Sequence, residues 1–179
     1  MPDTITSADG ALRPSLQPSL RWMLHDPARM IALCGGIGLA RFAPGTFGTL
    51  IAFPLQWWIA PYFSDPVWLG VLAAAFAVGI WACGRTGRAL GAADHGAIVW
   101  DETVAFLLVL VFTPGGWRWQ ALAFVLFRFF DIVKPPPIRY FDARWKNGFG
   151  VMFDDLLAAF FTLLILAAIK EWTTGLWLY

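Results

Sequence analysis

Long runs without a charged residue dominate the chain. No Asp, Glu, Lys or Arg occurs in residues 42–64 or 66–84, and shorter uncharged runs cover residues 103–117, 119–127 and 156–169. Because an α-helix rises about 1.5 Å per residue, roughly 20 apolar residues span a bilayer. The pattern predicts an all-α integral membrane helical bundle with about five transmembrane crossings. We expect them near residues 47–63, 66–83, 99–113, 118–133 and 154–170.

The ends of these segments carry amphipathic aromatic residues, which are typical of membrane interfaces. They are Trp57, Trp58, Tyr62, Trp68, Trp117, Trp119, Trp172, Trp177 and Tyr179. The chain is 59% hydrophobic and 14% charged, whereas average globular usage is roughly 45–50% apolar and about 25% charged. A soluble helical bundle with an unusually apolar core is the alternative.

Basic residues predict the orientation of the bundle. Four arginines precede the first crossing, and further Lys and Arg residues lie in the second and fourth connections: Arg13, Arg21, Arg29, Arg41, then Arg85, Arg88, Lys134, Arg139, Arg144 and Lys146. Short cytoplasmic loops are enriched in Lys and Arg. We therefore expect the N-terminus and these two connections to be cytoplasmic, with residues 62–66, residues 113–117 and the C-terminus outside.

The remaining composition limits the domain organisation and the partners. Residues 1–20 are rich in Pro and Ser with mixed charge and are expected to be a disordered tail, so residues 21–179 form a single membrane domain. Residues 27–40 are apolar but short and interrupted by glycine, which favours an interfacial or re-entrant segment. Thirteen basic against twelve acidic residues offer no excess charge for nucleic acid. Cys34 and Cys83 suit neither a disulfide framework nor a zinc site.

Acidic residues gather at the predicted cytoplasmic face. Two adjacent pairs each begin an apolar helix and two further acids lie at the same face: Asp101-Glu102, Asp154-Asp155, Asp94 and Asp131. For one pair alone, complementing the helix dipole is the simpler explanation. Together they favour a hard divalent cation with oxygen ligands, Mg²⁺ or Mn²⁺. The candidate metal ligands are Asp101, Glu102, Asp131, Asp154 and Asp155.

A glycine- and threonine-rich turn is the first candidate for phosphate binding. Residues 44–49 directly precede a predicted helix, where backbone N–H groups can approach an anion. Thr46, Gly48 and Thr49 lie in this turn, and Arg41 adds a cation. An ordinary helix cap is the alternative.

A second group of candidates surrounds the end of the fourth crossing. Arg128, Asp131 and Lys134 share one helical stripe, which is either a self-neutralising set of ion pairs or part of a site. In the functional interpretation Asp131 is a metal ligand or base, and Lys134 with Arg139 holds phosphate. Asp94 and His95 are candidates for catalytic proton transfer; a structural role is the alternative for this histidine.

Four sequence blocks contain these residues: RFAPGTFGT at 41–49, DHGAIVWDE at 94–102, FRFFDIVKPPPI at 127–138 and GFGVMFDD at 148–155. Their content and order resemble the phosphatidylglycerophosphatase A family. The resemblance implies an all-helical, Mg²⁺-dependent phosphatase of the bacterial inner membrane that converts phosphatidylglycerophosphate to phosphatidylglycerol. It makes Asp94, Asp101, Glu102, Asp131, Asp154 and Asp155 the acidic motif positions and Lys134 the basic one.

The residues by themselves leave one other class open, a non-enzymatic membrane protein such as a divalent-cation carrier or an assembly subunit. A carrier needs acids near the midplane and usually an internal repeat. Here the acids lie at one face and no repeat is visible. An enzyme acting on a phospholipid substrate in the membrane, with its site facing the cytoplasm, is therefore the favoured interpretation.

Overall fold

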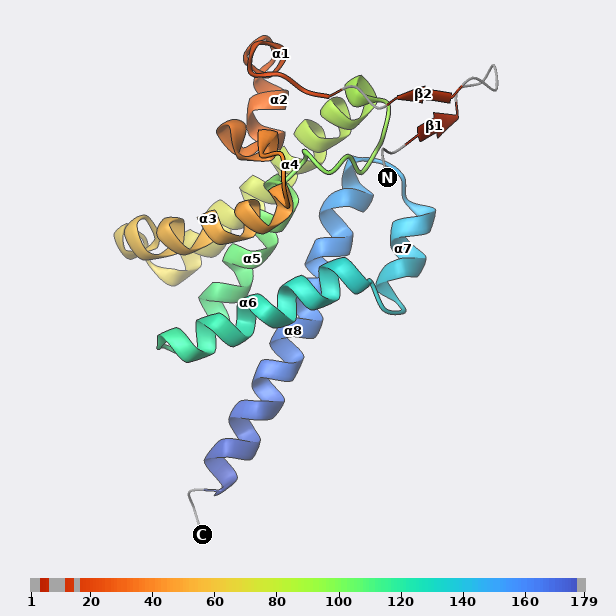
Figure 1. The fold of residues 1–179 in the computed structure, drawn as a ribbon. Helices are drawn as coiled ribbons and strands as arrows, with labels where there is room; N and C mark the ends of the chain where they lie inside the picture. The colour runs from red at the N-terminus through yellow and green to blue at the C-terminus, as the bar shows by residue number, and fades with distance from the viewer. Residues whose placement is uncertain (1–3, 7–11, 15–16, 177–179) are drawn as a thin grey trace.

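The computed structural model describes residues 4–6, 12–14 and 17–176, and these are almost entirely helical (Figure 1). The helices are α1 (Leu20–Leu24), α2 (Pro27–Ala32), α3 (Pro44–Trp58), α4 (Asp65–Leu90), α5 (Trp100–Phe112), α6 (Trp117–Val133), α7 (Ile138–Arg144) and α8 (Gly148–Leu176), with 3-10 turns at Cys34–Leu39 and Ala60–Tyr62. Two short strands, β1 (Thr4–Thr6) and β2 (Leu12–Pro14), pair antiparallel. The predicted all-α fold is confirmed. Much of the predicted disordered tail, residues 1–3, 7–11 and 15–16, lies outside the described residues.

Helix α5 forms the centre of the bundle, packed against α3, α4 and α8. Its Phe106 is fully buried, and the ring centroids of Phe53 from α3 and Phe127 from α6 each lie 5.3 Å from that of Phe106. A helix surrounded by other helices is apolar around most of its circumference. The acids at the start of α5, Asp101 and Glu102, are therefore the exception that needs an explanation.

One end of the bundle gathers the polar segments. The start of α3, the end of α4, the start of α5, the end of α6 and the start of α8 all lie there (Figure 1). Gly91 ends α4 in the left-handed region at φ 80°, a conformation that costs glycine little. Lys134 ends α6, and the prolines at 135–137 prevent the helix from continuing. These stops bring residues 94–102 and 131–155 to the same end.

Close helix contacts rely on glycine at two positions that concern this end. A Cβ on Gly148 would overlap the backbone of Ile80 and Gly84, so α4 and α8 approach closely where α8 begins. A Cβ on Gly48 would come within 2.7 Å of Val99 Cβ, so α3 packs tightly on the start of α5. Gly48, predicted to bind phosphate, thus lies in a helix-packing contact.

Two helices among the described residues are long and apolar enough to cross a bilayer, α4 and residues 148–173 of α8. Only 28% and 39% of their most apolar stretches are buried, and large apolar side chains such as Trp81 and Phe160 are exposed. The core helix of a soluble bundle would be covered on most sides, so this exposure favours a bilayer. Helices α3, α5 and α6 have 15, 13 and 17 residues, fewer than the roughly 20 of a perpendicular crossing. The count of five crossings stays a prediction.

The segment 27–40 forms two short helical pieces: α2, which packs against α4, and the 3-10 turn that follows it, which packs against α3. Asp26 caps α2, and its carboxylate accepts a hydrogen bond of 2.8 Å from Arg85 Nε of α4. This hydrogen bond lowers the pKa of Asp26. The ion pair between Asp26 and Arg85 therefore stabilises the packing of this segment at the polar end of the bundle.

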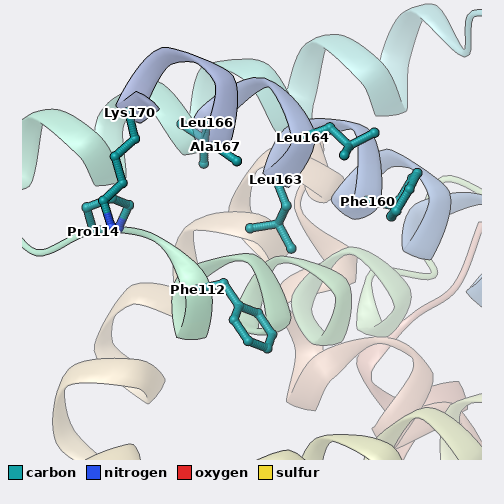
Figure 2. A pocket seen from close by; sticks show the side chains of 8 residues that line it. All are labelled: Phe112, Pro114, Phe160, Leu163, Leu164, Leu166, Ala167 and Lys170. Atoms are coloured by element: carbon teal, nitrogen blue, oxygen red, sulfur yellow. The ribbon is translucent and has the colours of Figure 1, made fainter. Parts of the chain in front are cut away.

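The far end of the bundle has an apolar hollow of about 440 Å³, between the end of α5 and the second half of α8 (Figure 2). Phe112, Pro114, Leu163 and Lys170 are among its lining residues. Leu163 is eight residues after Asp155 on α8, which corresponds to about 12 Å along the axis. The hollow is therefore separate from the polar end and contributes nothing to the site described below.

Candidate active site

A cavity of about 100 Å³ lies at the polar end of the bundle. Six carboxylates and one ammonium line it, supplied by the 91–99 connection and by α5, α6 and α8: Asp94, Asp101, Glu102, Asp131, Asp154, Asp155 and Lys134. These are all seven of the acidic and basic motif positions. The structure therefore brings together residues that lie up to 61 positions apart in the sequence.

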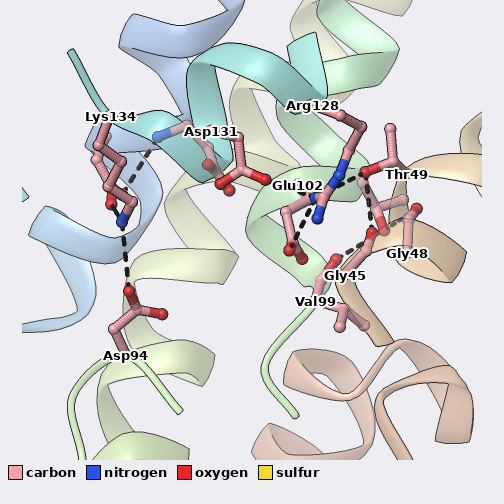
Figure 3. Close-up of polar contacts among 12 residues, drawn as sticks. Gly45, Gly48, Thr49, Asp94, Val99, Glu102, Arg128, Asp131 and Lys134 are labelled. Carbon is pink, nitrogen blue, oxygen red and sulfur yellow. Dashed lines mark hydrogen bonds and ion pairs between the residues drawn. The ribbon is translucent and has the colours of Figure 1, made fainter. Parts of the chain in front are cut away.

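Lys134 lies among three carboxylates. Its Nζ pairs with Asp94 Oδ2 at 3.4 Å (Figure 3). It also pairs with Asp142 Oδ1 at 3.1 Å and with Asp154. Burial disfavours the ammonium, but the charges of Asp154 and Asp94 outweigh this effect and raise the pKa of Lys134 above its usual value. The ammonium is accordingly a permanent positive charge in the cavity.

Asp142 belongs to this group although it was not among the predicted site residues. It lies on α7, and burial of its carboxyl is outweighed by hydrogen bonds from Lys134 and Lys146, which lower the pKa of Asp142. Residues 135–137 turn the chain so that α7 packs back on α8. Three consecutive prolines end a helix, but the sequence does not show in which direction the chain then turns.

Arg128 organises the opposite side of the cavity. From α6 it pairs with Asp131 at 2.5 Å and with Glu102 Oε1 at 3.4 Å, and its Nη1 donates to Thr49 Oγ1 at 3.4 Å (Figure 3). Thr49 is fully buried and donates its own proton to Gly45 O at 2.9 Å. A Cβ on Gly45 would overlap Glu102 Oε1. The start of α3 is thus a cradle for the Arg128–Glu102 pair.

Arg128 was predicted only as a member of the stripe with Asp131 and Lys134, without a role of its own in the site. A charge inside an otherwise apolar segment, three residues before Asp131, was the available signal. Thr49 has a positioning role in this geometry, because its hydroxyl contacts Arg128 and the α3 backbone rather than the cavity.

Two groups of carboxylates have the spacing of a metal site. Asp101, Glu102 and Asp155 offer one oxygen each within 4.8 Å of one another, and so do Asp94, Asp142 and Asp154. The second group already surrounds the Lys134 ammonium. The group of Asp101, Glu102 and Asp155 is therefore the better metal site.

Burial supports the same choice. Asp101 and Asp155 are each 4% exposed, and Asp101 Oδ1 and Glu102 Oε2 are buried without a hydrogen-bond partner in the described residues. Burying carboxylate oxygens without a partner is unfavourable. A hard cation that takes oxygen ligands compensates for it. These residues fit a divalent metal ion, whereas Asp131 and Asp154, also predicted as ligands, line the same cavity but lie outside this group of three.

Six predicted residues do not line this cavity, and two of them, Gly48 and Thr49, make the α3 contacts described above. Arg41 and His95 line a neighbouring cavity of about 210 Å³, and His95 is buried, with its Nδ1 accepting the Ala97 N–H at 3.1 Å. Thr46 lies in the first turn of α3, where its N–H donates to Ala43 O at 3.0 Å. Arg139 is exposed on α7.

Comparison with known proteins identifies the family of this chain. The family model described as phosphatidylglycerophosphatase A matches residues 30–170. A Haemophilus influenzae protein named phosphatidylglycerophosphatase A is 42% identical over 156 residues, which are 87% of this chain and 96% of the relative. An Escherichia coli protein of the same name is 35% identical over 158 residues, with 87% and 91% covered.

A Bacteroides thetaiotaomicron relative, 40% identical over 149 residues with 78% and 91% covered, carries the provisional name phosphatidylinositol-3-phosphatase. No solved structure matches the chain.

Proposed function

This chain belongs to the phosphatidylglycerophosphatase A family, and from that premise we propose that it hydrolyses the terminal phosphate monoester of phosphatidylglycerophosphate. The products are phosphatidylglycerol and inorganic phosphate. The reaction takes place at the cytoplasmic face of a bacterial inner membrane, where the polar end of the bundle meets the lipid headgroups.

The observation that carries this proposal is the pair of buried, unpartnered oxygens on Asp101 and Glu102, beside Asp155. Six carboxylates around a small cavity would repel a phosphate monoester unless a divalent cation offsets their charge. We propose Mg²⁺, with Mn²⁺ as a substitute, held by Asp101, Glu102 and Asp155. When bound, Mg²⁺ polarises the phosphate and lowers the pKa of a nearby water.

The chain's own residues supply the other requirements of phosphate hydrolysis. The Lys134 ammonium lines the cavity and can donate hydrogen bonds to phosphate oxygens, so it offsets charge on the transferred group. Asp94 has a side chain 42% exposed at the mouth of the cavity. It is suited to exchange a proton with solvent and to protonate the leaving glycerol oxygen. Asp131 is oriented by Arg128 and completes the metal environment.

The carrier alternative is less well supported. The acids lie where several helices begin or end, rather than along a path through the bundle. A cation carrier needs its ligands near the bilayer midplane. A phosphatase needs them where a headgroup can reach them.

The direct test is phosphate release by purified protein in detergent. We expect inorganic phosphate from phosphatidylglycerophosphate with Mg²⁺ or Mn²⁺, and a loss of at least a hundredfold in excess chelator that returns when Mg²⁺ is restored. Full activity in chelator would refute the metal assignment, and no release with either cation would refute the activity. Phosphatidylinositol 3-phosphate, assayed in parallel, tests the specificity suggested by the third relative's name.

The orientation has its own test in a variant without Cys34 and Cys83. Ala143→Cys, exposed on α7, is expected to react with a membrane-impermeant thiol reagent only in inverted vesicles. Ser64→Cys, exposed before α4, is expected to react only from the outside of spheroplasts. The reason is the positive charge of Arg139, Arg144 and Lys146 close to the predicted crossings. Labelling of Ala143→Cys from the periplasmic side would reverse the orientation.

A further inference from the structure

We propose that the cavity lined by Arg41 and His95 is a second anion subsite, which binds the phosphodiester that remains on the lipid while the terminal phosphate is hydrolysed. The inference rests on the proposed function and deepens it. It changes the role expected for Arg41 from the sequence, because Arg41 then holds the phosphate that is not cleaved.

The two cavities share one wall. Asp94 and Ile98 line the acidic cavity, His95 and Ala97 line the neighbouring one, and Gly96 lines both. The segment therefore presents successive residues to opposite sides. Gly96 has open space beside it, because nothing lies within 4 Å of the position that a Cβ would occupy. A ligand with two anionic groups joined by a short linker can occupy both cavities across Gly96.

The two cavities differ in charge. Six carboxylates line the first, whereas none of the described residues lining the second is acidic. Arg41 is exposed at the second cavity and makes no hydrogen bond or ion pair with the described residues. Pro44, the first residue of the 15-residue helix α3, also lines it, so the positive end of the helix dipole adds to the guanidinium.

The His95 ring is held in one orientation. Its Nδ1 accepts the Ala97 N–H at 3.1 Å, so the neutral ring carries its proton on Nε2. The ring is 8% exposed and is held in the wall by this bond. His95 is thereby a positioning residue for the wall between the two cavities.

The substrate has the matching chemistry. In phosphatidylglycerophosphate a glycerol joins a terminal monoester to a phosphodiester that carries a single negative charge. A planar guanidinium with several donors suits the two free oxygens of a diester, whereas the monoester suits the metal and Lys134. A lipid with a monoester alone, such as phosphatidic acid, would leave the second cavity empty.

The test distinguishes the two anion-binding cavities by two inhibitors, phosphatidylglycerol for the second cavity and inorganic phosphate for the acidic one. In Arg41→Ala, we expect a rise of about tenfold in KM for phosphatidylglycerophosphate and in the inhibition constant of the product phosphatidylglycerol, with kcat within twofold of wild type. The inhibition constant of inorganic phosphate, which probes the acidic cavity, should not change. Arg41→Lys should recover part of the affinity. Arg144→Ala removes an exposed arginine of α7 at the same end and should behave as wild type.

Each other outcome overturns the subsite. A lower kcat together with weaker inhibition by inorganic phosphate would mean that Arg41 contacts the hydrolysed group. Unchanged KM and unchanged inhibition by phosphatidylglycerol would mean that Arg41 contacts no anion. If wild-type protein releases no phosphate, the proposed function fails instead, and equilibrium binding of phosphatidylglycerol to wild type and Arg41→Ala still decides the subsite. Arg41 is exposed, and a thermal melt confirms that its variants fold.

Discussion

Replacing Asp155 with Asn is expected to lower kcat/KM by at least about a thousandfold, equivalent to about 4 kcal/mol of transition-state stabilisation. Asp155 is 4% exposed and lies with Asp101 and Glu102 in the carboxylate group that fits a metal ion. The amide preserves shape but removes a charge and an anionic oxygen. Steady-state phosphate release at saturating Mg²⁺ measures the effect.

The Tm of the same variant distinguishes a metal ligand from a residue that only contributes to packing. Without metal, Asp155→Asn removes one of three buried like charges, so its Tm in chelator should equal or exceed that of wild type. Mg²⁺ should raise the Tm of wild type, because an ion that binds only the folded state stabilises it. The variant should lose most of this shift.

Asp65→Asn is the matched control, since Asp65 is an exposed acid in the first turn of α4. It is expected to retain wild-type turnover and to change stability by about 0.3–1 kcal/mol at most. If Asp155→Asn behaved like Asp65→Asn, the Asp155 carboxylate would hold no metal ion and the metal site would be refuted.

Replacing Lys134 with Met is expected to impair both activity and stability. Asp94, Asp142 and Asp154 would lose the ammonium that they share. Removing one partner of a buried ion pair costs about 3–5 kcal/mol. The Lys134 side chain is 21% exposed, which places the expected loss in the free energy of unfolding toward the lower end. We expect kcat/KM to fall at least about a hundredfold, because the phosphate loses its lysine donor.

Two control variants test whether the effects of Lys134→Met are specific to the Lys134 ammonium. Lys146→Met removes an ammonium that is 54% exposed and, among the residues that the structure describes, pairs with Asp142 alone, so it should cost no more than about 1 kcal/mol and leave turnover unchanged. Lys134→Arg keeps the charge but not the compact ammonium, so it should recover more stability than activity. Thermal melts and phosphate release measured together would contradict the assignment if Lys134→Met matched Lys146→Met.

The hydrophobic pattern predicted the long helices but misplaced some of their ends. The first crossing, expected at 47–63, corresponds to α3, Pro44–Trp58, and the last, expected to begin at 154, lies in α8, which begins at Gly148. A charged residue does not mark the boundary of this apolar helix. In the structure Asp154 and Asp155 lie inside α8 and face the cavity, where Lys134 pairs with Asp154.

The sequence by itself determined the all-α class, the gathering of the acids at one end and the family, because these follow from spacing along the chain and from residue identity. Only the tertiary structure decided which charges meet. Arg128 reaches Glu102, and Lys134 reaches Asp142, because of how α6 is rotated and how the prolines turn the chain toward α7. A Gly-Thr turn can equally cap a helix, bind phosphate or cradle a neighbour. For Gly48 and Thr49 the choice depends on what lies opposite, and that is Val99 and Arg128.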